Sequence, residues 1–263
     1  MMVFTLAQRE LRTLFVSPMA WTIMAITQLI LAFIFLALVE GYIVNQPQLM
    51  MLENVPGVTE RIIAPLYGAT AWIFMMVVPL LTMRIISEER RNHSLTLLQS
   101  APVSMTEIII GKFLGIMLFL LLMTSLLSLM PLSLLLAGNL DAGHFLSILI
   151  ALVLVIASFS ALGLYLSTLT EQPIVAAIGT YGALLLLWII DIGSNSVENI
   201  EASGLLSYLS MLRHFDALAR GIFSSVDVVY FILFICLFLV LSIRRLDTCL
   251  LYTSDAADDR YKV

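Results

Sequence analysis

The stretch RIISEERRNHSLTLLQSAPVSMTE, residues 84–107, is a charged break between two apolar runs that are each long enough to cross a membrane. The stretch holds three of the 13 Lys and Arg residues in a chain whose charged residues make up only 12%. Pro102 cannot continue a helix, and Ser104-Met-Thr-Glu107 has the pattern of a capping box that opens one. The pattern predicts a helix, a break, a short helix, a second break and another helix.

The short helix is predicted over residues 94–100. Leu95 and Leu98 fall on one face of it at i, i+3 spacing, with Leu97 beside them. A short apolar-faced helix held between two spans can dock into a groove of a soluble partner and transmit a push to both spans. The alternative is a solvated loop whose charges only set the membrane topology.

The rest of the composition indicates a membrane protein. Hydrophobic residues make up 61% of 263 and the mean hydropathy is +1.04, whereas a soluble domain is about 45–50% apolar. A bilayer core takes roughly 20 apolar residues as helix, and lipid leaves no partner for unpaired backbone groups. We therefore predict an all-α fold with six spans: residues 20–39, 68–86, 108–136, 145–169, 174–192 and 226–243.

The basic residues are distributed unequally between the two sides of these spans. Most of them fall on one side: Arg9, Arg12, Arg84, Arg90, Arg91, Lys112, Arg244 and Arg245. The other side has Arg61, Arg213 and Arg220 among more numerous acidic residues. Because Lys and Arg favour the cytoplasmic side of short loops, both termini and residues 84–107 are predicted to be cytoplasmic, in a prokaryotic inner membrane.

The N-terminal residues 3–16 have apolar side chains at helical spacing. We predict an amphipathic helix that lies along the inner bilayer surface and ends at Ser17-Pro18. The residues assigned to this interface helix are Phe4, Leu11, Arg12 and Phe15. The alternative is a basic end that only sets topology, and the pattern is not that of a cleavable signal peptide.

The segments outside the spans are short. Residues 40–67 are predicted to form an external loop with a short helix, and residues 193–226 a longer external segment. Residues 1–248 are predicted to form one six-span transmembrane domain. The last residues, 249–263, resemble translated adapter read-through and are excluded from the fold, the alternative being a disordered acidic tail.

Two sets of motifs resemble those of type-2 ABC exporter permeases, in the branch that contains gliding-motility and copper-site maturation permeases. The first set includes Leu80-x-x-Met83-Arg84, Ser87-Glu-Glu-Arg90, Ser94-Leu-x-Leu97-Leu98-x-Ser100-Ala-Pro-Val103 and Glu107-Ile-x-x-Gly111-Lys112-Phe113. The second is His214-Phe215-Asp216-Ala217-x-Ala219-Arg220-Gly221 with Asp227-x-Val229-Tyr230-Phe231. The similarity covers about residues 3–247 and departs at Asn92-His93-Ser94, where many relatives have a Gly-Thr pair.

The resemblance implies the membrane half of an exporter that pairs with a second permease copy, as a homodimer or heterodimer, and is driven by cytoplasmic ABC ATPase subunits. Residues 87–104 would be the coupling region, braced by the N-terminal helix. The residues expected to contact the ATPase are Glu88, Glu89, Arg90, Arg91, Ser94, Leu95, Leu98, Gln99 and Pro102. No G-x-x-x-x-G-K-[ST] motif occurs, so ATP and Mg²⁺ are expected on the partner, with no cofactor, metal or nucleic acid bound by this chain.

Other functions are less well supported by the residues. Glu88-Glu89 with His93 faintly resembles intramembrane proteases, but those need their carboxylates and histidines within the membrane. Ion-coupled carriers usually need charges at mid-depth, and the predicted spans contain almost none. A non-transporting membrane scaffold for an ATPase partner remains the alternative to the exporter.

Overall fold

A computed structural model describes residues 2–49, 57–92, 104–134, 141–196, 210–221 and 224–260, and the regular structure in these ranges is helical throughout. The elements in chain order are α1 (Met2–Val16), α2 (Pro18–Leu49), the π-helix η1 (Thr59–Ile63), α3 (Ala64–Thr82), α4 (Ser87–Arg91), α6 (Met105–Ser133), α7 (Ala142–Leu169), α8 (Pro173–Ser196), α10 (Met211–Ala219) and α11 (Ser225–Arg260). The predicted all-α class is confirmed for these residues.

Among the described residues, five helical stretches are long and apolar enough to cross a membrane. They are Pro18–Pro47, Thr59–Arg91, Met105–Ser133, Ala142–Leu169 and Ser225–Thr248, and each contains most or all of one predicted span. The predicted fifth span falls on α8, whose apolar part, Pro173–Ile189, is shorter. Six crossings therefore remain a prediction, while five described helical stretches have the length and composition of membrane spans.

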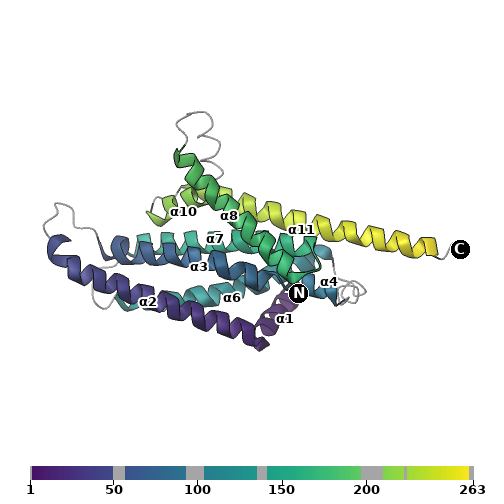
Figure 1. The fold of residues 1–263 in the computed structure, drawn as a ribbon, viewed down its shortest axis with the longest axis horizontal. Helices are drawn as coiled ribbons and strands as arrows, with labels where there is room; N and C mark the ends of the chain where they lie inside the picture. Colours follow the sequence, from purple (N-terminus) through teal and green to yellow (C-terminus); the bar gives the residue numbers. More distant parts are fainter. Residues whose placement is uncertain are drawn as a thin grey trace.

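Helix α7 lies at the centre of the bundle and packs against α3, α6, α8, α10 and α11 (Figure 1). The core is apolar and continuous, with Phe74 and Val78 of α3 against Leu152 and Ile156 of α7 all buried. Helices α2 and α11 leave most of their apolar side chains exposed or only partly buried in the single chain. In a bilayer such faces can contact lipid without cost, because helices satisfy their own backbone hydrogen bonds.

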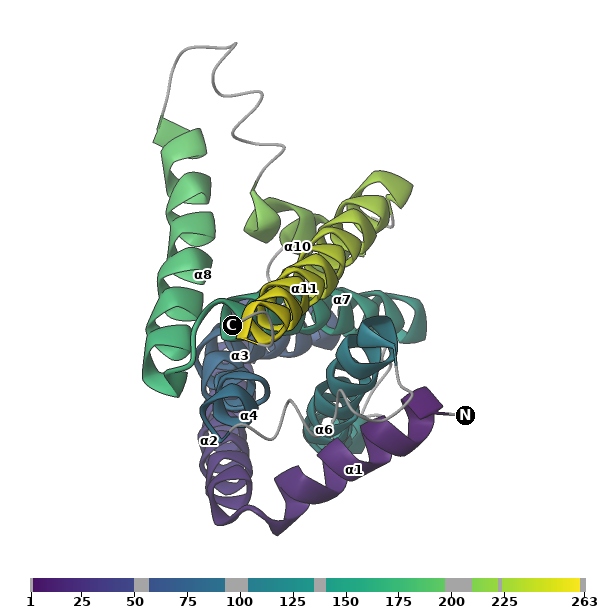
Figure 2. The ribbon, with the colours of Figure 1, turned by 90° about the vertical axis from the view of Figure 1, so that its right-hand side faces the viewer.

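Helix α1 crosses the end of the bundle instead of running along it. Figure 2 looks along the long axis and shows α1 lengthwise, while α2, α3 and α6 are seen nearly end-on. The chain leaves α1 at Ser17, and α2 begins at Pro18, as predicted from the Ser-Pro pair. The same end of the bundle holds α4 and the C-terminal half of α11, whereas α10 lies at the opposite end (Figure 1).

The structure corrects the prediction that residues 40–67 form an external loop. Helix α2 continues to Leu49 with Pro47 in its last turn, and η1 and α3 begin at Thr59 and Ala64. Proline removes one backbone donor, but near a helix end the lost bond is tolerated. Continuing the helix beyond the apolar run keeps the remaining backbone groups paired, so the loop is much shorter than its polar composition indicated.

The second correction concerns the exit from the second span. The sequence predicts a continuous second span over residues 68–86, whereas α3 ends at Thr82 and a turn over residues 83–86 separates it from α4. The contacts that hold this turn are described below.

Other boundaries follow the sequence more closely. Ser104 caps α6 by accepting from the Glu107 backbone N–H, and the Glu107 side chain accepts from Ser104, so the capping box is confirmed. Asp141 caps α7, and residues 170–172 form the tight connection to α8. Helix α11 continues to Arg260 and so includes most of residues 249–263, which the sequence analysis excludes from the fold. The predicted short helix at 94–100 lies outside the described residues, as do residues 197–209 and 222–223 of the predicted external segment.

Candidate functional site

The turn between α3 and α4 is held by a serine from α7. The Ser167 hydroxyl accepts hydrogen bonds from the backbone N–H groups of Ile86, at 3.3 Å, and Ser87, at 3.2 Å. The same hydroxyl donates to the carbonyl oxygen of Met83 at 3.3 Å, and the Ser87 hydroxyl also donates to that oxygen. A single buried side chain thus satisfies backbone groups that the end of α3 leaves without helical partners.

A glycine one helical turn earlier on α7 lets this part of the chain approach. A Cβ on Gly163 would overlap the hydroxyl of Thr82. Gly163 and Ser167 are four residues apart, the small-xxx-small spacing that brings helices into close contact. The last turn of α3 and the start of α4 therefore pack closely against α7 at Gly163 and Ser167.

A buried lysine links three helices at the same end. Lys112 of α6 is 2% exposed. Its Nζ lies 2.8 Å from Oε1 of Glu10 in α1 and 2.8 Å from Oε1 of Glu89 in α4. It also donates to the carbonyl oxygen of Ile85 at 3.1 Å. All three ammonium donors thus have acceptors, and one cation lies between two carboxylates.

Arg90 ties α4 to the end of α7. Its Nη1 donates to the carbonyl oxygen of Thr168 at 2.6 Å, and its Nη2 lies 3.8 Å from Oε1 of Glu171. A cation at a helix C-terminus interacts favourably with the unpaired carbonyl groups there. Helix α4 is therefore attached to α1 and α6 through Glu89 and to α7 through Arg90. We call the contacts of Lys112, Ser167 and Arg90 the α4 junction.

The four charged residues that the sequence assigns to the ATPase contact divide into two pairs. Glu89 and Arg90 are bound within the chain, with side chains 17% and 21% exposed. Glu88 and Arg91 are exposed. The charges of Glu89 and Arg90 therefore have partners within the bundle, and the contact of all four residues with an ATPase stays a prediction. The remaining predicted contact residues, Ser94, Leu95, Leu98, Gln99 and Pro102, lie outside the described residues.

Helix α1 packs against α6 through two glycines. A Cβ on Gly111 would lie 2.7 Å from Cβ of Leu6, and a Cβ on Gly115 would lie 2.7 Å from Cβ of Glu10. The close approach also brings the Glu10 carboxylate to Lys112, one residue after Gly111. The Gly-x-x-x-Gly spacing is visible in the sequence, and it is the signal that identifies the partner of α1.

The predicted interface-helix residues differ in their surroundings. Phe15 and Leu11 pack against the core, and the Phe15 ring meets Phe119 edge-on at 5.7 Å between centroids. Phe4 is 71% exposed, and Arg12 is exposed. Leu11 and Phe15 thus attach the helix to the bundle. Phe4 and Arg12 remain accessible to groups outside the chain.

A second polar cluster lies at the opposite end. Nδ1 of His214 in α10 is 2.5 Å from Oδ1 of Asp227 in α11, and the His214 ring stacks on Tyr230 with centroids 4.2 Å apart. The Ser147 hydroxyl of α7 donates to the Leu218 carbonyl at 2.8 Å. These contacts pack α10 on the bundle, and they show that His214, which the sequence places outside the membrane, is buried.

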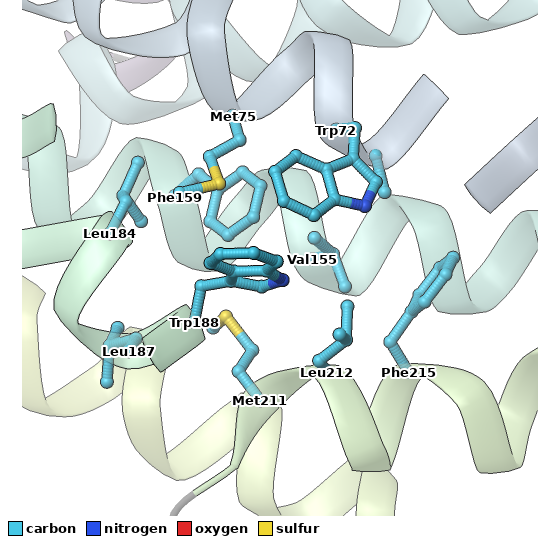
Figure 3. A pocket seen from close by; sticks show the side chains of 11 residues that line it. Trp72, Met75, Val155, Phe159, Leu184, Leu187, Trp188, Met211, Leu212 and Phe215 are labelled. Carbon is cyan, nitrogen blue, oxygen red and sulfur yellow. The ribbon is translucent and has the colours of Figure 1, made fainter. Parts of the chain in front are cut away.

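An apolar pocket of about 40 Å³ lies between α3, α7, α8 and α10 (Figure 3). Trp72 and Trp188 meet edge-on with ring centroids 4.7 Å apart. The Trp188 Nε1 is buried and has no hydrogen-bond partner among the described residues. Ligand pockets usually exceed about 300 Å³, so this one is a packing gap between helices and is too small to be a ligand site.

The polar side chains of the α4 junction connect α1, α4, α6 and α7 to one another. No group of three or more His, Cys, Asp or Glu side chains gathers as a metal site within the described ranges. The contacts that sequence reasoning missed are the pairing of Lys112 with Glu10 and Glu89, the seating of α3 on Gly163 and Ser167, and the His214–Asp227 pair.

A model of the family described as ABC-2 family transporter protein matches residues 4–249. The matched range reaches from α1 into α11 and includes the complete α4 junction. No curated protein gives a significant match to the chain.

Proposed function

Because the chain belongs to the ABC-2 family of transporter membrane proteins, we propose that it is the permease subunit of an exporter driven by separate ATPase subunits. ATP and Mg²⁺ would bind to those subunits, and this chain would convert their movement into an opening between two permease copies. The two copies would form a homodimer or a heterodimer. The branch of gliding-motility and copper-site maturation permeases is part of the proposal and rests on the motifs alone.

The observation that supports this function best is the position of Lys112. Its two carboxylate partners belong to α1 and α4, so a displacement of α4 is resisted by α1 and α6 together. Arg90 adds a connection to α7. A push on residues 93–103, which follow α4 directly, would therefore move several helices as a unit and would not be lost in a local bend.

The proposed orientation places the α4 junction in the cytoplasm. This end of the bundle carries most of the Lys and Arg residues, which favour the cytoplasmic side. Helix α1 would lie in the plane of the inner bilayer surface, as its crosswise direction in Figure 2 allows. Helix α8 has 24 residues, and at about 1.5 Å per residue it is long enough to make the sixth crossing.

The docking residues are tested by a paired substitution. Leu95→Asp together with Leu98→Asp would place two charges on the predicted apolar face, and burying an unpaired charge is costly. We expect stimulation of the co-purifying ATPase by the permease to be lost in proteoliposomes while the permease still folds. ATP hydrolysis with and without the variant is the measurement.

Thr96→Asp with Ser100→Asp is the matched control, because it adds the same charges to the opposite face of the predicted helix. The control is expected to retain stimulation. If the Leu95 and Leu98 variant also retains it, the docking assignment is wrong.

A further inference from the structure

A cavity of about 350 Å³ lies at the charged end of the bundle, between α1, the start of α2, the end of α3 and α4. This volume falls in the range of small-molecule sites, about 300–1,000 Å³. Both charged and apolar side chains line the cavity. The charged members are Arg9, Glu10, Arg84, Glu88 and Glu89, and the apolar members include Leu14, Met19, Leu80 and Leu81.

Some of the charged residues around the cavity form ion pairs within the chain, and others do not. Glu10 and Glu89 share the buried Lys112. Arg9, Arg84 and Glu88 are exposed, and they form no ion pair with the residues that the structure describes. Two arginines with free donors and one free carboxylate suit a ligand that carries both an anionic and a cationic group. Arginine is well suited to phosphate oxygens because its planar group can donate two parallel hydrogen bonds.

An apolar stripe continues from the cavity along α3. Leu80 lines the cavity and is 38% exposed, and Met76 and Trp72 follow at four-residue intervals on the same face, 55% and 38% exposed. The eight residues from Leu80 to Trp72 span about 12 Å of helix. A ligand with its polar group in the cavity could therefore lay a hydrocarbon chain along this face.

The cavity also lies at the depth where lipid head groups are expected. Ser17, at the turn between crosswise α1 and membrane-spanning α2, is one of its lining residues. An amphipathic helix in the plane of the bilayer sits at the boundary between head groups and acyl chains. The site therefore borders the region that phospholipids occupy in the proposed orientation.

We propose that this cavity binds the head group of a phospholipid carrying a phosphate and a primary ammonium group, with an acyl chain along Leu80, Met76 and Trp72. The phosphate would accept hydrogen bonds from Arg9 and Arg84, and the ammonium would donate to Glu88. A primary ammonium can donate hydrogen bonds to a carboxylate, whereas the quaternary ammonium of a choline head group cannot. Because Glu10 and Glu89 line the same cavity, the bound lipid would contact α1 and α4 beside the α4 junction.

The test uses the purified full chain without ATPase, incubated with equimolar phosphatidylethanolamine, phosphatidylcholine and phosphatidylglycerol, and counts retained lipids by native mass spectrometry. Wild-type protein should retain phosphatidylethanolamine preferentially. Arg9→Gln with Arg84→Gln should lower its retention at least about tenfold, because the charge-assisted hydrogen bonds to the phosphate are lost. Glu88→Gln should reduce the preference for phosphatidylethanolamine over phosphatidylglycerol.

Arg244→Gln with Arg245→Gln is the matched control. It removes the same charge from exposed positions on α11 that do not line the cavity, and it should retain the wild-type preference. Equal retention by wild type and the Arg9 and Arg84 variant would overturn the proposal, as would an equal loss in the control.

A final arm separates the lipid from a soluble ligand and from a protein contact. Free phosphoethanolamine should compete only weakly, because it lacks the acyl chain; competition as strong as that of the lipid would contradict the assignment. If the Arg9 and Arg84 variant keeps the lipid but no longer co-purifies with the ATPase, the cavity is a partner contact instead. The lipid measurement requires no ATPase, so its failure leaves the exporter proposal standing.

Discussion

Lys112 is the residue whose environment differs most from what its sequence position indicates. In sequence it is one cytoplasmic cation among several, whereas in the structure it is the buried partner of two carboxylates from other helices. A buried charge with all its hydrogen bonds made is tolerated, but its partners become costly when it is removed. Removal of the Lys112 side chain is therefore expected to cost more stability than removal of any other single contact of the α4 junction.

We predict that Lys112→Met destabilises the protein by about 3 kcal/mol, the size expected when one member of a buried ion pair is removed. Glu10 and Glu89 would then face each other with 17% of each side chain exposed. The change should appear as a lower midpoint of thermal unfolding in detergent. Arg91→Gln, at an exposed site on α4, is the control and should shift the unfolding free energy by less than about 0.5 kcal/mol.

The same argument predicts a rescue. Adding Glu10→Gln and Glu89→Gln to Lys112→Met removes both uncompensated charges and should recover more than half of the lost unfolding free energy. If the triple variant is as unstable as Lys112→Met alone, the loss comes from packing and not from charge.

At the scale of elements, the break between α3 and α4 is a feature that the local sequence pattern does not predict. The apolar run and the charged run are clear in sequence, and a continuous helix through both is the simplest prediction. The structure interrupts the helix over residues 83–86 because Ser167 of α7 offers an alternative acceptor for two backbone N–H groups. That acceptor is about 80 residues away in the chain, so no local pattern indicates it.

Ser167→Ala should leave the Ile86 and Ser87 backbone donors without partners, at a cost of about 1–3 kcal/mol for each buried group. Faster hydrogen exchange at those two amides is the direct readout. Ser160→Ala is the matched control on the same helix, because the Ser160 hydroxyl is equally buried and donates only to Ile156 of its own helix. Unchanged exchange in the Ser167 variant would mean that the turn is held by other contacts.

At the scale of the whole molecule, the orientation in the membrane follows from the unequal charge of the two ends. Arg91 and Arg220 are exposed at opposite ends of the bundle. In a background with Cys236→Ser and Cys249→Ser, Arg220→Cys should react with a membrane-impermeant maleimide on intact cells. Arg91→Cys should react only after permeabilisation. The reverse pattern would invert the proposed topology and remove the basis for an ATPase contact at α4.

The sequence by itself determined the all-helical class, five of the membrane-spanning stretches, the break at Ser17-Pro18 and the capping box at Ser104. These features depend on the hydrophobicity of continuous stretches and on interactions within four residues. The local sequence is therefore sufficient to predict them. The same reading placed the coupling region, including residues 93–103 beyond the described structure, where its role remains a proposal.

Only the tertiary structure decided which side chains meet. Lys112 with Glu10 and Glu89, Ser167 with the turn after α3, and His214 with Asp227 are all brought together by helix packing. Most of these partners are many residues apart, and their charges or hydroxyls are equally compatible with exposed positions. Close approach at Gly111, Gly115 and Gly163 selects the pairing, because a side chain at any of these positions would hold the helices apart.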